Sequence, residues 1–169
     1  QLTKVLTCSV VGFPLSNSVT NTIIAETKQA IQDGAKEIDM VIKVSWLKDK
    51  DYQSVLSEIS AISQVCSEHG AILKVIFENC LLKKEEIIIS AILSKKAGAE
   101  FIKTSTGFNK SGAILEDVEL MRNVVGPKLG VKAAGGIRDR VTAKAMLKAG
   151  ANRIGASATV EILKEEYED

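Results

Sequence analysis

Strand-like and helix-like segments alternate along the whole chain, and this alternation constrains the fold more than any other feature of the sequence. Short apolar runs between breaker residues are typical of strands, and apolar residues repeated every three or four positions are typical of helices. The predicted strands span residues 4–12, 35–42, 71–78, 99–104, 129–134 and 151–156. The predicted helices span residues 19–32, 52–68, 84–97, 114–124, 141–148 and 160–166. Such an order predicts an α/β protein whose parallel strands are joined by helical crossovers.

A glycine marks each predicted passage from a helix to the next strand. These glycines are Gly34, Gly70, Gly98, Gly130 and Gly150. Glycine readily adopts the left-handed conformation that ends a helix, so each is expected to act as a helix cap. No linker or low-complexity segment divides the chain, and we therefore expect residues 1–169 to belong to a single domain.

Ionisable residues interrupt four successive strands that are otherwise largely apolar, as expected of a sheet covered on both faces. They are Asp39, Lys74 and Glu78, Lys103, and Lys132. In a (β/α)8 barrel the catalytic side chains gather where the C-terminal ends of the strands meet, whereas an open sheet uses only one switch point. The pattern therefore favours a (β/α)8 TIM barrel, of which about six of the eight βα units can be read in this chain.

Lys103 and Lys132 are predicted to lie near the ends of neighbouring strands. A lone lysine there could simply reach solvent from the end of its strand. Two lysines side by side can instead lower each other's pKa, and a neutral amine can attack a carbonyl to form an imine. Asp39 can move protons during that reaction. These three residues therefore predict an aldolase or decarboxylase of the imine-forming kind.

The last two predicted strands end in glycine-containing loops. Gly135 and Gly136 follow one strand, and Gly155 and Ser157 follow the next. Loops of this kind often hold a phosphate in barrels, because their backbone N–H groups can donate to the anion. We expect a phosphate site here. Two arginines near these loops, Arg138 and Arg153, are interpreted as surface charges.

Composition excludes several other classes of function. The formal net charge is +1 and aromatic residues make up 4% of the chain, which argues against nucleic-acid binding and an anionic membrane surface. The apolar runs are too short to span a bilayer. Three scattered cysteines and a single histidine provide no metal-ligand spacing, and no cofactor motif is present. We expect no metal, no cofactor, no nucleic acid and no membrane, and unpaired thiols favour a cytoplasmic location.

Four motifs give the chain a resemblance to the deoxyribose-phosphate aldolase family. They are Val11–Leu15 (VGFPL), Glu37–Ile42 (EIDMVI), Phe101–Phe108 (FIKTSTGF) and Gly130–Arg138 (GVKAAGGIR). The resemblance covers essentially the whole chain. It implies a class I aldolase on a (β/α)8 barrel that reversibly joins acetaldehyde and glyceraldehyde 3-phosphate, without a metal, in the cytosol and often as a homodimer.

The same resemblance implies a role for each candidate residue. Lys103 would form the Schiff base, Lys132 would lower its pKa, and Asp39 would relay protons. The substrate phosphate would lie against Gly135, Gly136, Gly155 and Ser157. From the residues alone, independently of the resemblance, Lys74 and Glu78 are expected to support the site as an ion pair at the barrel mouth.

Two kinds of departure from the family keep alternatives open. Ala158 and Thr159 replace a common serine and glycine beside the expected phosphate site, and both changes are expected to weaken or crowd it. The family's first two strands cannot be read here, and the sequence starts with Gln1. The missing units could precede this segment in a longer protein, the chain could complete its barrel by homo-oligomerising, or it could be a catalytically silent relative that binds only phosphate or a partner subunit. A different phosphosugar aldolase of transaldolase type is a further alternative.

Overall fold

The computed structural model describes residues 5–164, which fold into six βα repeats. The strands are β1 (Cys8–Val11), β2 (Glu37–Val41), β3 (Ile72–Ile76), β4 (Phe101–Lys103), β5 (Gly130–Ala134) and β6 (Arg153–Gly155). The helices are α1 (Thr20–Gln32), α2 (Val44–Lys48), α3 (Tyr52–Glu68), α4 (Lys84–Lys96), α5 (Leu115–Val125), α6 (Arg140–Lys148) and α7 (Thr159–Lys164), with a 3-10 turn, η1 (Asn79–Leu81). The predicted order is confirmed, and α2 and η1 lie between the predicted elements. In this part of the chain no helix is long and apolar enough to cross a bilayer.

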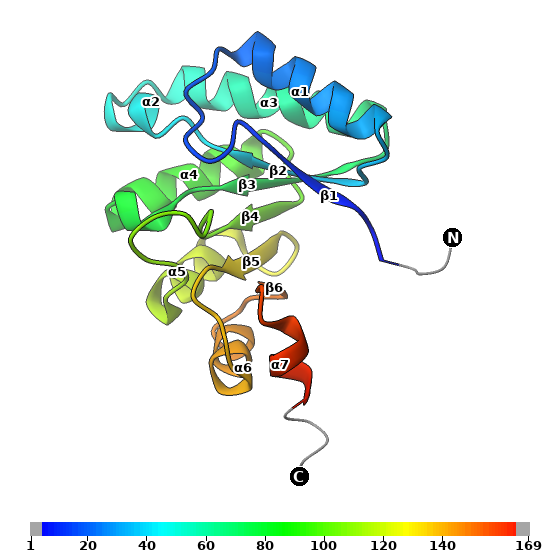
Figure 1. Cartoon of the computed structure of the whole chain (residues 1–169). Coiled ribbons are helices and arrows are strands. Elements are labelled where there is room, and N and C mark those ends of the chain that lie inside the picture. The colour runs from blue at the N-terminus through cyan, green and yellow to red at the C-terminus, as the bar shows by residue number, and fades with distance from the viewer. Residues whose placement is uncertain (1–4, 165–169) are drawn as a thin grey trace.

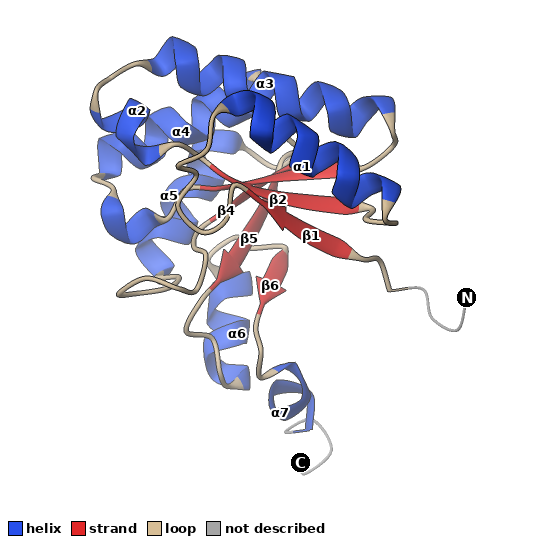
Figure 2. Cartoon of the chain, turned by 45° about the horizontal axis from the view of Figure 1, so that its top comes forward, coloured by secondary structure: helices blue, strands red, loops and turns tan. Residues whose placement is uncertain are grey.

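All six strands are parallel and lie in the sheet in the order in which they occur in the sequence. Figure 1 shows the sheet curling from β1 to β6, with the helices on its outer face. In Figure 2, which is turned by 45°, β1 and β6 form the two edges of the curl and the helices again lie outside it. The arrangement is a half-barrel, which is the predicted partial (β/α)8 fold.

The side chains of each strand alternate between the two faces of the sheet. The outward residues, such as Ile38, Leu73 and Val131, are fully buried in the apolar core beneath the helices. The inward residues include the ionisable ones, for example Asp39 and Lys74 on adjacent strands. The helix-covered face of the strands is therefore apolar, whereas their inward face mixes the ionisable residues with apolar ones such as Ile76 and Phe101.

Four of the five junction glycines have the predicted left-handed conformation, and Gly130 does not. Gly126, with φ +72°, follows α5, whereas Gly130 is the first residue of β5. A Cβ atom on Gly130 would lie only 2.2 Å from Cδ1 of the Phe101 ring. Gly130 is thus required by the close approach of an aromatic side chain on the neighbouring strand.

Candidate active site

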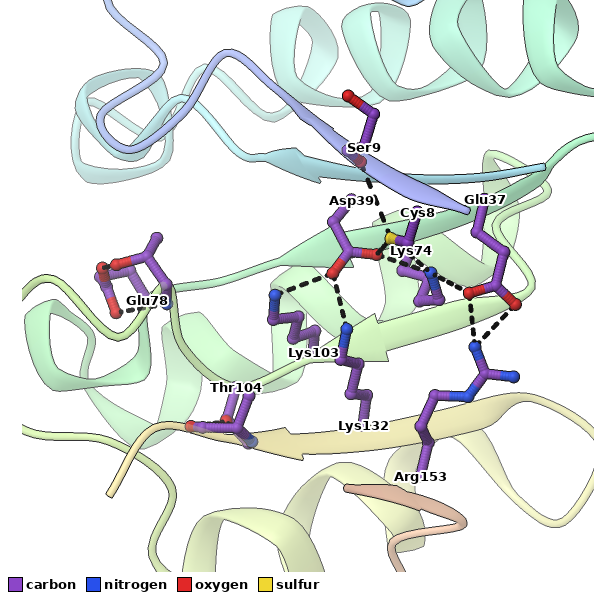
Figure 3. Close-up of polar contacts among 12 residues, drawn as sticks. Cys8, Ser9, Glu37, Asp39, Lys74, Glu78, Lys103, Thr104, Lys132 and Arg153 are labelled. Atoms are coloured by element: carbon purple, nitrogen blue, oxygen red, sulfur yellow. Dashed lines mark hydrogen bonds and ion pairs between the residues drawn. The ribbon is translucent and has the colours of Figure 1, made fainter. Parts of the chain in front are cut away.

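The inner face of the half-barrel is built from layers of side chains contributed by alternate strands, as in complete barrels. One layer comes from β2, β4 and β6, the next from β1, β3 and β5, and the third again from β2, β4 and β6. In this order the layers contain Glu37, Phe101 and Arg153; Cys8, Lys74 and Lys132; and Asp39, Lys103 and Gly155. Figure 3 shows how the charged side chains of these layers converge. Asp39 and Lys103 therefore lie one layer closer to the C-terminal ends of the strands than Lys74 and Lys132.

The two predicted lysines meet at one carboxylate oxygen. Lys103 and Lys132 are paired in register on β4 and β5. The Nζ atom of each lies 2.8 Å from Oδ2 of Asp39, which comes from β2 (Figure 3). The three side chains are largely buried, with 9%, 13% and 2% of their surface exposed for Lys103, Lys132 and Asp39. The structure therefore brings together the three residues that were predicted from separate strands.

This geometry gives Lys103 and Asp39 unusual protonation behaviour. Burial lowers the pKa of Lys103, the charge of Lys132 lowers it further, and the attraction of Asp39 only partly opposes the change. Burial alone would raise the pKa of Asp39, but the adjacent Lys103 and Lys132 outweigh it and hold that pKa far below its usual range. The site thus contains a permanent carboxylate next to an amine that loses its proton more easily than an ordinary lysine.

The second oxygen of Asp39 is occupied by a third lysine. Nζ of Lys74 lies 2.7 Å from Oδ1 of Asp39 and 2.9 Å from Oε2 of Glu37, and the lysine side chain is completely buried. Burial would lower the pKa of Lys74, but hydrogen bonds to Asp39 and Glu37 raise it instead. The Cys8 thiol is 3.3 Å from both Lys74 Nζ and Asp39 Oδ1. Lys74 is therefore held as a cation.

The expected ion pair between Lys74 and Glu78 is wrong. Glu78 lies four residues beyond Lys74, in the segment that leads from β3 into η1, and its carboxylate accepts hydrogen bonds from Thr106 N, at 3.2 Å, and Thr106 Oγ1. Glu78 itself is buried and has a φ of +56°. Its contact ties the loop that follows Lys103 to the end of β3, so Glu78 supports the site through Thr106.

The residues expected to bind phosphate line one cavity together with the lysines. Its volume is about 440 Å³, and its walls include Gly135, Gly136, Gly155 and Ser157 as well as Lys103 and Lys132. Gly155 is needed for space, because a Cβ atom there would lie 3.0 Å from Cε of Lys132 and 2.9 Å from Cβ of Ala134. The four predicted residues and Lys103 therefore line one cavity, so a single substrate could place its phosphate near the four residues and its carbonyl carbon near Lys103.

Of the two arginines interpreted as surface charges, Arg138 is exposed, whereas Arg153 is partly buried and paired. Arg138 lines the same cavity. Nη1 of Arg153 lies 2.7 and 2.6 Å from the two carboxylate oxygens of Glu37, and its guanidinium lies over the Phe101 ring. Sequence reasoning missed Glu37 and Cys8 as parts of this interior. The signal available was the two-residue period of a strand, since Glu37 precedes Asp39 by two positions and must share its face.

Known proteins share both the sequence and the fold. The model of the DeoC/LacD family aldolases matches residues 7–165. A deoxyribose-phosphate aldolase from Clostridium novyi is 54% identical over 96% of this chain and 72% of its own length, and one from Thermococcus kodakarensis is 53% identical over 92% and 70%. Both relatives are therefore somewhat longer than the matched segment.

Solved structures agree with this relationship. An aldolase described as QR15 superposes with a TM-score of 0.93 at 41% identity, covering 98% of this chain and 74% of that one. The deoxyribose phosphate aldolase from Aeropyrum pernix, described as a unique tetramer, gives a TM-score of 0.87 at 34% identity and covers 95% and 67%. The shared fold accounts for the curl of the sheet, and the chain belongs to the DeoC/LacD family of aldolases.

Proposed function

We propose that this chain is a deoxyribose-phosphate aldolase, a lyase that reversibly cleaves 2-deoxyribose 5-phosphate to acetaldehyde and glyceraldehyde 3-phosphate through a lysine imine. The observation that carries the proposal is the meeting of Lys103 and Lys132 at a single oxygen of Asp39. The names of the relatives support the substrate. Buried titratable groups with perturbed pKa values cluster at functional sites, which favours an active enzyme over a catalytically silent relative.

In the proposed cleavage, the neutral amine of Lys103 attacks the aldehyde carbon C1 of the open-chain sugar. The resulting carbinolamine loses water and leaves a protonated imine. Asp39 and Lys132 lie on the Nζ side of Lys103 and can move the protons that this step requires, directly or through a water molecule. Asp39 also offsets the positive charge of the imine.

The imine nitrogen then accepts the electron pair of the breaking carbon–carbon bond. The bond between C2 and C3 breaks, the C3 hydroxyl loses its proton, and C3 becomes the aldehyde carbon of glyceraldehyde 3-phosphate. The two-carbon enamine that remains on Lys103 is protonated at C2, and water releases acetaldehyde and restores the amine. Synthesis follows the same steps in reverse.

The substrate phosphate is proposed to bind at the far end of the cavity from Lys103. Gly135, Gly136 and Gly155 offer a wall without side chains, and Ser157 can add a hydroxyl donor. Arg138 lines the same cavity and would add a positive charge. The residue after Ser157 is Ala158, whose side chain is only a methyl group.

Borohydride trapping tests the central claim. The protein is incubated with 2-deoxyribose 5-phosphate or acetaldehyde, reduced, digested and analysed by mass spectrometry. We expect one adduct on Lys103, none in Lys103→Ala, and an unchanged adduct in Lys144→Ala, which removes an exposed lysine on α6. A folded wild-type chain that forms no adduct would support the silent alternative, and an adduct only with other phosphosugars would favour transaldolase-type chemistry.

The finer biological assignment is proposed with the same activity. A substrate of this kind places the enzyme in deoxyribonucleotide catabolism, and its three unpaired cysteines suit the cytoplasm. We propose that residues 1–169 are part of a single barrel domain and that the protein assembles as a homodimer or another homo-oligomer. Light scattering of the purified protein would give its subunit number.

A further inference from the structure

A line of alternating charges continues from the three candidate catalytic residues into the interior of the half-barrel. Arg153 contacts Glu37, Glu37 contacts Lys74, and Lys74 contacts Asp39, with nitrogen–oxygen distances of 2.6, 2.9 and 2.7 Å. Asp39 then reaches Lys103 (Figure 3). Arg153 and Glu37 are the far end of this line, and neither touches Lys103.

Arg153 is fixed in its place by more than the ion pair. Its guanidinium lies 4.8 Å from the centre of the Phe101 ring, and that ring occupies the space left by Gly130. Its Nη1 lies within hydrogen-bonding distance of both oxygens of Glu37, so the arginine joins β6 to β2 across the inner face. A cation held this way has a fixed position at the edge of the interior, with 36% of its side chain still exposed.

The interior contains more positive than negative groups. Each strand contributes to it: Cys8 from β1, Glu37 and Asp39 from β2, Lys74 from β3, Lys103 from β4, Lys132 from β5 and Arg153 from β6. With every lysine protonated, four cations face two carboxylates, because burial and the nearby Asp39 raise the pKa of the Cys8 thiol and keep it neutral. Loss of one proton from Lys103 reduces this excess of positive charge.

We propose that Glu37 and Arg153 are positioning residues that set how readily Lys103 releases its proton, by fixing Lys74 against Asp39 and by adjusting the net charge of the interior. The inference rests on the proposed function, since it concerns the nucleophile of that reaction. Glu37 holds Lys74 as a cation, so that Lys74 does not compete as an amine. Arg153 offsets the second carboxylate, so that Glu37 does not make Lys103 retain its proton.

The two residues should therefore act in opposite directions. In Arg153→Gln a cation is lost, Glu37 is less compensated, and Lys103 holds its proton more tightly. In Glu37→Gln a carboxylate is lost, the excess of positive charge grows, and Lys103 releases its proton more readily. The double variant loses one charge of each sign and should behave nearly as the wild type.

The test is the rate of imine trapping by cyanoborohydride with acetaldehyde, measured from acid to alkaline pH and expressed as the ratio of the acid rate to the alkaline rate. This ratio cancels losses that are independent of pH. We expect it to fall about three- to tenfold in Arg153→Gln, to rise by a similar factor in Glu37→Gln, and to return to within about twofold of the wild type in the double variant. Glu119→Gln, which removes an exposed carboxylate on α5, should leave it unchanged.

The outcomes separate this inference from the proposed function. Shifts in the same direction, or an unchanged ratio in both single variants, would overturn the positioning role and leave the pair with a purely structural one. A wild type that traps nothing on Lys103 would overturn the proposed function itself. If Arg153→Gln does not fold, Arg153→Lys keeps the charge and should keep the wild-type ratio at lower stability, while Glu37→Gln still must raise it.

Discussion

The charge of Lys132 can be tested by replacing it with methionine, which keeps an unbranched side chain as far as Cε and removes the charged Nζ. In the native site the Nζ atoms of Lys103 and Lys132 both lie 2.8 Å from Oδ2 of Asp39, so they are at most twice that distance apart. The substitution removes a neighbouring positive charge and leaves this oxygen to Lys103 alone. Both changes raise the pKa of Lys103, so a smaller fraction of its amine is neutral at a given pH.

The size of the effect follows from the separation of the two charges. Two unit charges about 5 Å apart in surroundings with an effective dielectric constant of about 20 repel by about 3 kcal/mol. Both side chains are mostly buried, so solvent weakens this repulsion little. An energy of that size corresponds to about a 100-fold change in the proton equilibrium. At acid pH, where the neutral fraction limits the reaction, imine formation in Lys132→Met should be slower by up to about that factor.

The assay is single-turnover trapping of acetaldehyde on Lys103 across a range of pH, because it does not require the later proton transfers. The deficit should be large at acid pH and should shrink as the pH rises. Lys132→Arg keeps the charge and should show a much smaller acid deficit, and Lys144→Met should behave as the wild type. A deficit of equal size at every pH would mean that Lys132 acts by geometry or proton transfer alone, and the electrostatic reasoning would be refuted.

Two further substitutions test the structural and phosphate-binding roles. Gly130→Ala places a Cβ atom 2.2 Å from Cδ1 of Phe101 and should lower the free energy of unfolding by about 1–3 kcal/mol in a urea titration. Adding Phe101→Leu should recover part of this loss. No recovery would contradict the steric explanation. Ser157→Ala should raise the KM for 2-deoxyribose 5-phosphate about tenfold, the value of a hydrogen bond to a charged group, while acetaldehyde trapping stays unchanged. Equal loss with both substrates would place Ser157 outside the phosphate site.

Much of the fold follows from the sequence because local patterns determine it. The predicted helix at residues 52–68 coincides with α3, Tyr52–Glu68, and every predicted strand overlaps an observed one. Helix α2 was missed because five residues are too few to display a helical period. The predicted ends at residue 4 and beyond residue 164 lie outside the described residues.

The candidate site was only partly predictable, and the reason is sequence distance. Lys103, Lys132 and Asp39 could be identified because parallel strands place their C-terminal ends at one edge. The pairing of Arg153 with Glu37 joins residues 116 positions apart and depends on which side chains cross the interior. The error for Lys74 has the same origin, since Glu37, Asp39 and Glu78 were all available carboxylates and only the register of β2 and β3 selects the first two.

The ion pairs of the interior also report the curvature of the sheet. Strands lie about 4.8 Å apart, so in a flat sheet β2 and β5 would be separated by about 14 Å, and β2 and β6 by about 19 Å. Yet Nζ of Lys132 on β5 lies 2.8 Å from Asp39 on β2. Nη1 of Arg153 on β6 lies 2.6 Å from Glu37, which is also on β2. Long side chains bridge part of these separations, and the remainder requires that the sheet curl toward its inner face, as Figure 2 shows. The meeting of the two lysines at Asp39 therefore depends on the fold as a whole, because a flatter sheet would carry Lys103 and Lys132 together away from Asp39 on β2 while leaving every strand intact.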